Sequence, residues 1–134
     1  MVRLPQKGTI MKHTEGFLTL VNDAKSRIRE VTVAETQKRM EQDPEVKLID
    51  VREDHEWEDA HAAGAMHLGK GIIERDIETT VPDKDTELIL YCGGGYRSAL
   101  VADVLQKMGY TNAFSMAGGW KAWKESGGEI SREK

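Results

Sequence analysis

The stretch Leu88-Ile-Leu-Tyr-Cys92-Gly-Gly-Gly-Tyr-Arg97-Ser98 passes from an apolar run through a glycine-rich turn into a helical pattern. The apolar run predicts a buried strand over residues 88–92, and the pattern that follows predicts a helix over residues 98–108. Gly109 stands where a helix commonly ends. The only cysteine of the chain is therefore expected at the end of a strand, directly before the N-terminus of a helix.

These surroundings favour the thiolate form of Cys92. A helix N-terminus carries partial positive charge, Arg97 adds a full charge, and glycines leave backbone N–H groups free to turn toward an anion. A thiolate in such a place is a nucleophile near neutral pH. The alternatives are a cysteine that is simply buried in the core and an arginine that only forms a surface ion pair. The combination of features favours a nucleophile in an anion-binding loop.

Outward from this junction, strand patterns alternate with helix patterns. Thr32 and Glu35 match a capping box, and Asp43-Pro44 ends the helix that this box begins. The further strands are expected at residues 28–31, 46–51, 64–68 and 114–116, and the further helices at residues 14–28, 33–41, 52–59, 72–78 and 120–127. This alternation predicts an α/β fold with a parallel sheet covered on both faces. Ligands of such sheets bind at the carboxyl ends of the strands, where Cys92 is expected.

The length of 134 residues suits one domain, preceded by an N-terminal extension. We expect the extension to cover residues 1–27 and the domain residues 28–130. The extension carries an amphipathic stripe of Phe17, Leu20, Val21, Ala24 and Ile28. This stripe predicts a helix that packs on the flank of the domain, and a helix that binds a partner protein is the alternative.

Composition limits the partners. A net charge of −4 argues against a nucleic-acid-binding protein, and no apolar run is long enough for a membrane span. One cysteine forms no internal disulfide, and His13, His55 and His67 lack metal-ligand spacing with it. We therefore expect no cofactor, no metal, no nucleic acid and no membrane, and a location in the reducing cytoplasm.

Four segments together resemble the rhodanese (sulfurtransferase) family. They are Leu48-Ile-Asp-Val-Arg52, His61-Ala-Ala-Gly-Ala65, Leu90-Tyr-Cys-Gly-Gly-Gly-Tyr-Arg-Ser98 and Met116-Ala-Gly-Gly-Trp120. The resemblance implies a three-layer α/β/α fold with a five-stranded parallel sheet. It also implies that the cysteine takes a sulfane sulfur from thiosulfate or a persulfide, holds it as a persulfide, and passes it to cyanide or a thiol.

The resemblance also assigns roles to residues. Cys92 would be the nucleophile and sulfur carrier, and Arg97 and Ser98 would also support the loop. Independently of the resemblance, we expect Asp50 and Arg52 to support the loop through hydrogen bonds or an ion pair, with direct contact to the substrate as the alternative. The substrate would be held by the loop and the start of the helix, that is by Gly93, Gly94, Gly95, Tyr96, Arg97 and Ser98. Tyr96 projects from the loop and is a candidate gate, and an exposed loop residue without such a role is the alternative.

Two other functions share this pattern. Cysteine-dependent phosphatases and similar arsenate reductases place five residues between cysteine and arginine, whereas this chain has four, which favours sulfur over a phosphoryl group. A rhodanese-like module that only binds a protein is the other alternative. Family members that use thiosulfate tend to carry a cation inside the loop. Gly93–Tyr96 has none, so we expect a persulfide to be the better donor.

Overall fold

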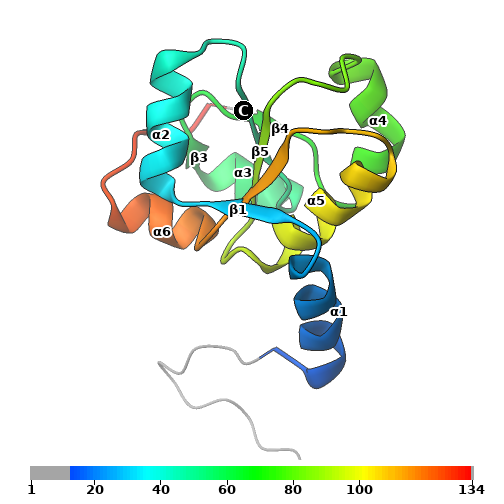
Figure 1. Ribbon diagram of the computed structural model, residues 1–134. Helices are drawn as coiled ribbons and strands as arrows, with labels where there is room; N and C mark the ends of the chain where they lie inside the picture. Colours follow the sequence, from blue (N-terminus) through cyan, green and yellow to red (C-terminus); the bar gives the residue numbers. More distant parts are fainter. Residues whose placement is uncertain (1–12, 134) are drawn as a thin grey trace, which may run out of the picture.

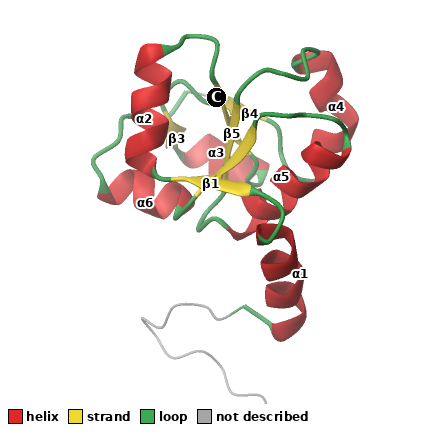
Figure 2. Cartoon of the chain, viewed as in Figure 1, coloured by secondary structure: helices red, strands yellow, loops and turns green. Residues whose placement is uncertain are grey.

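The computed structural model describes residues 13–133, which form a parallel sheet between two layers of helices (Figures 1 and 2). The five strands of this sheet are β1 (Arg29–Val31), β2 (Lys47–Asp50), β4 (Met66–His67), β5 (Leu88–Tyr91) and β6 (Ala113–Met116). The helices are α1 (Glu15–Lys25), α2 (Val33–Gln42), α3 (Asp54–Asp59), α4 (Ile73–Thr80), α5 (Tyr96–Lys107) and α6 (Gly119–Glu125). The predicted α/β fold with a five-stranded parallel sheet is confirmed.

The strand order β1-β6-β5-β2-β4 puts β5 in the middle of the sheet. Its neighbours are β2, where Asp50 pairs with Tyr91, and β6, where Ser115 pairs with Leu90. All three strands run in the same direction, so their carboxyl ends meet at one edge. Cys92 follows the last residue of β5 and lies at the centre of that edge.

Alternation along the strands builds two cores, because successive side chains point to opposite faces of a sheet. Leu88 and Leu90 of β5 pack with α4 and α5, whereas Ile89 and Tyr91 pack on the α2 and α6 side. Figure 1 shows these two layers on either side of the strands. The strand that carries Cys92 is thus buried on both faces, and this holds the position of the cysteine firmly.

The N-terminal helix α1 packs against α5, as the apolar stripe predicts for a helix on the flank of the domain. Val21 and Ala24 are buried, but Leu20 is 60% exposed, so its assignment to the buried stripe was wrong. The helix also ends at Lys25, three residues before the predicted end. The division of the chain after residue 27 stays a prediction.

An ion pair anchors the chain just after α1. Arg27 donates to both carboxylate oxygens of the buried Asp103 on α5, at 2.9 and 2.8 Å. Gln106, one turn further along α5, donates to the backbone oxygen of Arg27 at 3.0 Å. Together with the buried face of α1, these contacts hold the C-terminal end of the helix against α5.

Other details differ from the sequence predictions. Helix α5 begins at Tyr96, two residues earlier than expected, because the left-handed Gly95 (φ 96°) already turns the chain into the helix. The strand predicted at residues 64–68 forms only at Met66–His67. A separate antiparallel pair, β3 (His61–Ala62) with β7 (Ile130–Ser131), had no counterpart in the sequence analysis. Within residues 13–133, no helix is long and apolar enough to cross a bilayer.

Candidate functional site

The sulfur of Cys92 lies at the start of α5 and accepts backbone hydrogen bonds. The N–H groups of Gly95 and Ser98 point at Sγ from 3.2 and 3.3 Å. Both donors belong to the N-terminal end of the helix, where backbone N–H groups have no partner within the helix. This arrangement places two dipoles and the positive end of α5 on one sulfur atom, which stabilises negative charge there.

Two buried hydroxyl groups extend the hydrogen-bond network of the Cys92 sulfur. Cys92 Sγ lies 3.5 Å from Ser98 Oγ, which in turn lies 2.8 Å from Ser115 Oγ on β6. Since a hydroxyl can rotate to donate or accept, Ser98 can accept from the thiol or donate to the thiolate. The second hydroxyl, on Ser115, keeps Ser98 satisfied in either case.

The start of α6 is hydrogen-bonded to the Cys92 loop, which comprises residues 92–98. Trp120 N–H donates to the Cys92 carbonyl at 2.7 Å, and Lys121 N–H donates to the Gly93 carbonyl at 3.1 Å. This close approach requires Gly119, which has φ 53° and whose added Cβ would overlap the carbonyl oxygen of Cys92. The segment Gly118-Gly119-Trp120 therefore fixes how closely the start of α6 approaches the Cys92 loop.

Beneath the loop lies a cluster that we call the buried support, made of Asp50, Arg52 and Tyr91. Arg52 donates to both Asp50 oxygens, with a shortest distance of 2.7 Å, and Tyr91 Oη donates to Asp50 Oδ2 at 2.7 Å. Tyr91 Oη also accepts from the N–H of Ala62 at 3.0 Å, and Arg52 donates to the carbonyl of Ala60. The predicted ion pair exists, and its role in loop support stays a prediction.

Burial shapes the ionisation of this cluster. Asp50 is fully buried and Arg52 is 3% exposed. Burial works to lower the pKa of Arg52, but the hydrogen bond and charge of Asp50 raise it overall. Burial, followed by the charge of Asp50, raises the pKa of Tyr91 far above its usual range, so the phenol remains a donor. Every buried side-chain nitrogen and oxygen in the described part of the chain has a partner.

The guanidinium of Arg97 is shared between the loop and helix α3. It donates to both oxygens of Glu56, at 2.9 and 3.2 Å. The hydrogen bond to Glu56 is the largest cause that raises the pKa of Arg97, burial opposes it, and the charge of Cys92 adds to the rise. The full positive charge expected from Arg97 is therefore balanced in part by the Glu56 carboxylate.

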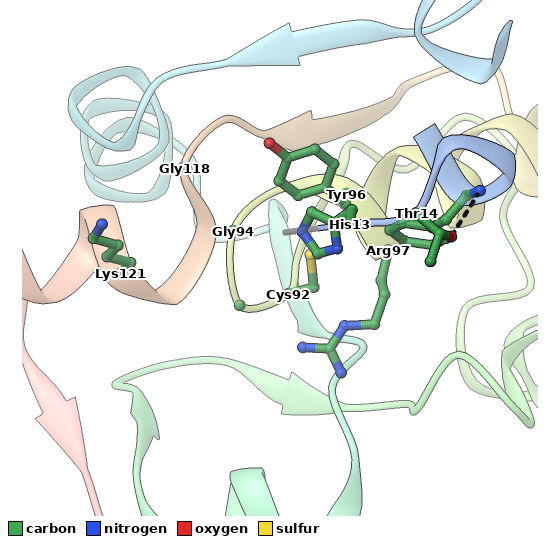
Figure 3. Close-up of a pocket in the computed structure, with 10 residues that line it drawn as sticks. His13, Thr14, Cys92, Gly94, Tyr96, Arg97, Gly118 and Lys121 are labelled. Carbon is green, nitrogen blue, oxygen red and sulfur yellow. Dashed lines mark hydrogen bonds between the residues drawn. The ribbon is translucent and has the colours of Figure 1, made fainter. Parts of the chain in front are cut away.

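A pocket of about 840 Å³ opens above Cys92 (Figure 3). Its residues come from the Cys92 loop, from the start of α6 and from the N-terminal end of α1, and they are His13, Thr14, Phe17, Cys92, Gly93, Gly94, Tyr96, Arg97, Gly118 and Lys121. These lining residues include two basic side chains, Arg97 and Lys121, and no carboxylate. The pocket is thus suited to an anion in a protein whose net charge is −4.

One side of the pocket, which we call the α1 wall, consists of His13, Phe17 and Tyr96. The His13 ring lies 4.3 Å from the Tyr96 ring and 5.1 Å from the Phe17 ring, centroid to centroid. Lys25, further along α1, lies over the Tyr96 ring at 5.3 Å. Tyr96 is thereby held against α1, so that the loop and the N-terminal helix form one continuous surface.

The structure brings most of the predicted site residues together. Cys92, Gly93, Gly94, Tyr96 and Arg97 line the pocket, whereas Gly95 and Ser98 are buried and contact the sulfur from below. Asp50 and Arg52 do not line the pocket.

Sequence reasoning missed several of the residues at the site. The helix α1 was expected to cover a flank or to bind a partner protein, so His13 and Phe17 were not assigned to the pocket, and neither was Lys121. Glu56 lies in the helix predicted at residues 52–59 and was not assigned to the site. The Glu53-x-x-Glu56 spacing indicates the start of a helix, where Glu56 accepts from the N–H of Glu53 at 3.1 Å, but it does not indicate the contact with Arg97.

No group of three metal-ligating side chains occurs among residues 13–133. The chemical groups at the site are the Cys92 thiol, backbone N–H groups and the side chains of Arg97 and Lys121.

The chain is similar to known proteins in sequence. The family described as the rhodanese-like domain matches residues 32–126. A putative sulfurtransferase of Bacillus subtilis, YtwF, is 36% identical over 97 residues, which cover 72% of this chain and 91% of the relative. The thiosulfate sulfurtransferase PspE of Escherichia coli is 36% identical over 73 residues, or 54% of this chain and 69% of the relative.

Solved structures agree with the fold. A Rhodopseudomonas palustris protein of unknown function, described as a possible tyrosine phosphatase, has a TM-score of 0.76 at 28% identity and covers 92% of this chain and all of its own. A thiosulfate sulfurtransferase from Pseudomonas aeruginosa has a TM-score of 0.73 at 29% identity, over 79% of this chain and 20% of its own.

Proposed function

Since the chain belongs to the rhodanese-like domain family and is related to sulfurtransferases, we propose that it transfers a sulfane sulfur through a persulfide on Cys92. The observation that carries the proposal is the pair of N–H groups, from Gly95 and Ser98, that converge on Sγ. These donors stabilise the attacking thiolate, and they remain close to the sulfur that it acquires.

The first half-reaction loads the cysteine. The thiolate of Cys92 attacks the outer sulfur of a donor, a bond forms between the two sulfurs, and the donor's own S–S bond breaks. The electron pair of that bond leaves with the remainder of the donor, which is sulfite when the donor is thiosulfate and a thiolate when it is a persulfide. No external oxidant or reductant is consumed.

The second half-reaction empties the cysteine. A thiophilic acceptor attacks the outer sulfur of the Cys92 persulfide, and the thiolate of Cys92 leaves, so that the site returns to its starting state. Cyanide would give thiocyanate, and a thiolate would give a new persulfide. A thiolate attack on sulfur requires no general base. We further propose a reducing, cytoplasmic setting, because Cys92 must be a free thiol before each cycle.

The second candidate function is phosphate ester hydrolysis, because the similar Rhodopseudomonas palustris structure is described as a possible tyrosine phosphatase. The geometry favours sulfur, because the nearest amides point at Sγ itself and only four residues separate Cys92 from Arg97. In addition, the guanidinium of Arg97 is bound to Glu56. A phosphoryl group needs several donors arranged around its three oxygens.

The test measures the mass of the intact protein after incubation with thiosulfate or a polysulfide, followed by a thiosulfate-to-cyanide transfer assay that detects thiocyanate. We expect the wild-type protein to gain one sulfur atom and to form thiocyanate. The Cys92→Ser variant should do neither, and Ser115→Ala, with its nucleophile intact, should still gain the sulfur.

The other two functions predict different results. A module that only binds a protein would gain no sulfur from either donor. A phosphatase would hydrolyse p-nitrophenyl phosphate in a Cys92-dependent manner. Either result would replace the proposal.

A further inference from the structure

The pocket above Cys92 is larger than an inorganic sulfur donor needs. We propose that the α1 wall and Lys121 form a subsite for the carbon chain and carboxylate of a small organic persulfide. This inference rests on the proposed sulfur transfer and adds the substrate class. In the proposal, the outer sulfur reaches Cys92, the carbon chain lies against Phe17 and Tyr96, and the carboxylate binds Lys121, all of which line the pocket.

The size of the pocket is the first support. A volume of about 840 Å³ lies within the range of roughly 300–1,000 Å³ that is typical of sites for small organic molecules. Thiosulfate, which has five non-hydrogen atoms, would contact only the floor of such a space. A thiol the size of a short peptide would reach from Cys92 to the walls.

The chemistry of the walls is the second support. The rings of Phe17 and Tyr96 are half-buried and lie 6.4 Å apart, centroid to centroid, with the His13 ring in contact with both. Aromatic surface of this kind binds carbon chains and excludes water, and it gives little to a bare oxyanion. The wall is therefore useful only for a donor with an organic part.

The charge of the pocket is the third support. Arg97 is already bound to Glu56, at 2.9 Å. Lys121 is the exposed cation among the lining residues, and it comes from α6, a different element from the α1 wall. A ligand that contacts both must have a carbon chain and a negative charge on one molecule, as a persulfide derived from an amino acid or a short peptide does.

The loading step balances without an added reagent. The thiolate of Cys92 attacks the outer sulfur of R–S–SH and the S–S bond of the donor breaks. The R–S⁻ thiolate leaves with the bonding electron pair, while the proton stays on the transferred sulfur, so Cys92 becomes Cys–S–SH. The organic thiol that leaves occupies the subsite until it dissociates.

The experiment compares the rate of sulfur gain by Cys92, followed by intact mass in single turnover, for three donors. They are thiosulfate, glutathione persulfide, and the uncharged persulfide of 2-mercaptoethanol. For Phe17→Ala, and to a lesser extent His13→Ala, we expect the rate constant with glutathione persulfide to fall about tenfold, as expected for a lost ring contact. The rate constant with thiosulfate should change less than about twofold, since no binding contact to it is lost.

The charge is tested by Lys121→Met. This variant should slow glutathione persulfide about fivefold, the loss expected of a charged hydrogen-bond donor, while the uncharged persulfide is unaffected. Leu20→Ala on the exposed face of α1 and Lys124→Met on α6 are the matched controls, because neither side chain lines the pocket. Both should behave as wild type with every donor.

The outcomes distinguish a failure of the proposed subsite from a failure of the proposed sulfur transfer. If the wild-type protein gains no sulfur from any donor, the proposed function itself is wrong. If it gains sulfur, but the variants slow all three donors equally or slow none, sulfur transfer stands and the subsite is overturned. Thermal unfolding of each variant identifies an equal loss as structural.

Discussion

The two sides of the Cys92 loop are built differently. Beneath the loop, the buried support pairs every polar group, and its members are at most 3% exposed. Above the loop, the α1 wall is half-buried or exposed, and rings rather than hydrogen bonds hold it together. The difference leads us to expect that the position of the cysteine depends on the satisfied polar cluster, whereas substrate choice depends on the more exposed surface, which tolerates change. Substitutions beneath the loop should therefore alter stability first, and substitutions above it should alter kinetics only.

The largest effect is expected from Arg52→Met. It leaves Asp50 fully buried without its ion-pair partner, and breaking a buried pair in this way costs about 3–5 kcal/mol of unfolding free energy. Urea unfolding measures the loss. Arg75→Met is the matched control, since it removes an exposed pair with Asp76 and should leave the free energy of unfolding close to wild type. Equal losses of unfolding free energy in Arg52→Met and Arg75→Met would show that the buried ion pair contributes no more to stability than an exposed one.

Gly119→Ala should follow, because it disturbs the contact between α6 and the loop. The left-handed φ and the overlap with the Cys92 carbonyl together cost about 2–4 kcal/mol. Sulfur transfer should also fall, since the loop must shift. Gly127→Ala has a similar φ of 77° but open space around its Cβ, so it isolates the cost of backbone conformation alone. Retained transfer in Gly119→Ala would show that the loop does not depend on this contact.

Tyr91→Phe removes one hydroxyl from the buried support. The Ala62 N–H and one Asp50 oxygen lose a partner, which is expected to lower the free energy of unfolding by about 1–2 kcal/mol. Calorimetric or urea unfolding provides the measurement. Tyr110→Phe is the control elsewhere in the core, where the hydroxyl donates only to the Val81 carbonyl. If Tyr110→Phe lost more free energy of unfolding than Tyr91→Phe, the hydrogen bonds of the buried support would contribute no more to stability than another buried hydroxyl does.

The smallest effect concerns Glu56→Gln, at the boundary between the two sides. Burial works to raise the pKa of Glu56, but the hydrogen bonds that its carboxylate accepts from Arg97 and from the Glu53 N–H lower the pKa overall, below its ordinary value of 4.5. A group whose folded pKa is depressed adds stability above its unfolded pKa, and this contribution is lost as the pH falls through the folded pKa.

The difference in unfolding free energy between wild type and Glu56→Gln should therefore be present at pH 7 and shrink below about pH 4.5. Urea unfolding at a series of pH values measures it. Glu125→Gln, at an exposed glutamate of α6, serves as the control for a general charge effect. A difference that stays constant down to pH 3 would contradict the assigned ion pair.

The sequence by itself determined the architecture and the centre of the site. The alternation of apolar runs and helical patterns predicts a parallel sheet, because local hydrophobic periodicity reflects which faces are buried. The Cys92 loop could be identified because its residues are contiguous, and the Thr32 and Glu35 capping box was found for the same reason. The Asp50 and Arg52 ion pair also lies within one short segment.

Only the tertiary structure decided what surrounds the loop. His13 and Phe17 reach the pocket because α1 packs along α5, and Glu56 reaches Arg97 from a helix 41 residues earlier in the chain. The pairing of β3 with β7 is of the same kind. Such contacts join residues distant in sequence, and the packing of whole elements determines them, so no local pattern of residues encodes them. The local surroundings of Cys92 were therefore predictable from the chain, whereas the aromatic wall of its pocket was not.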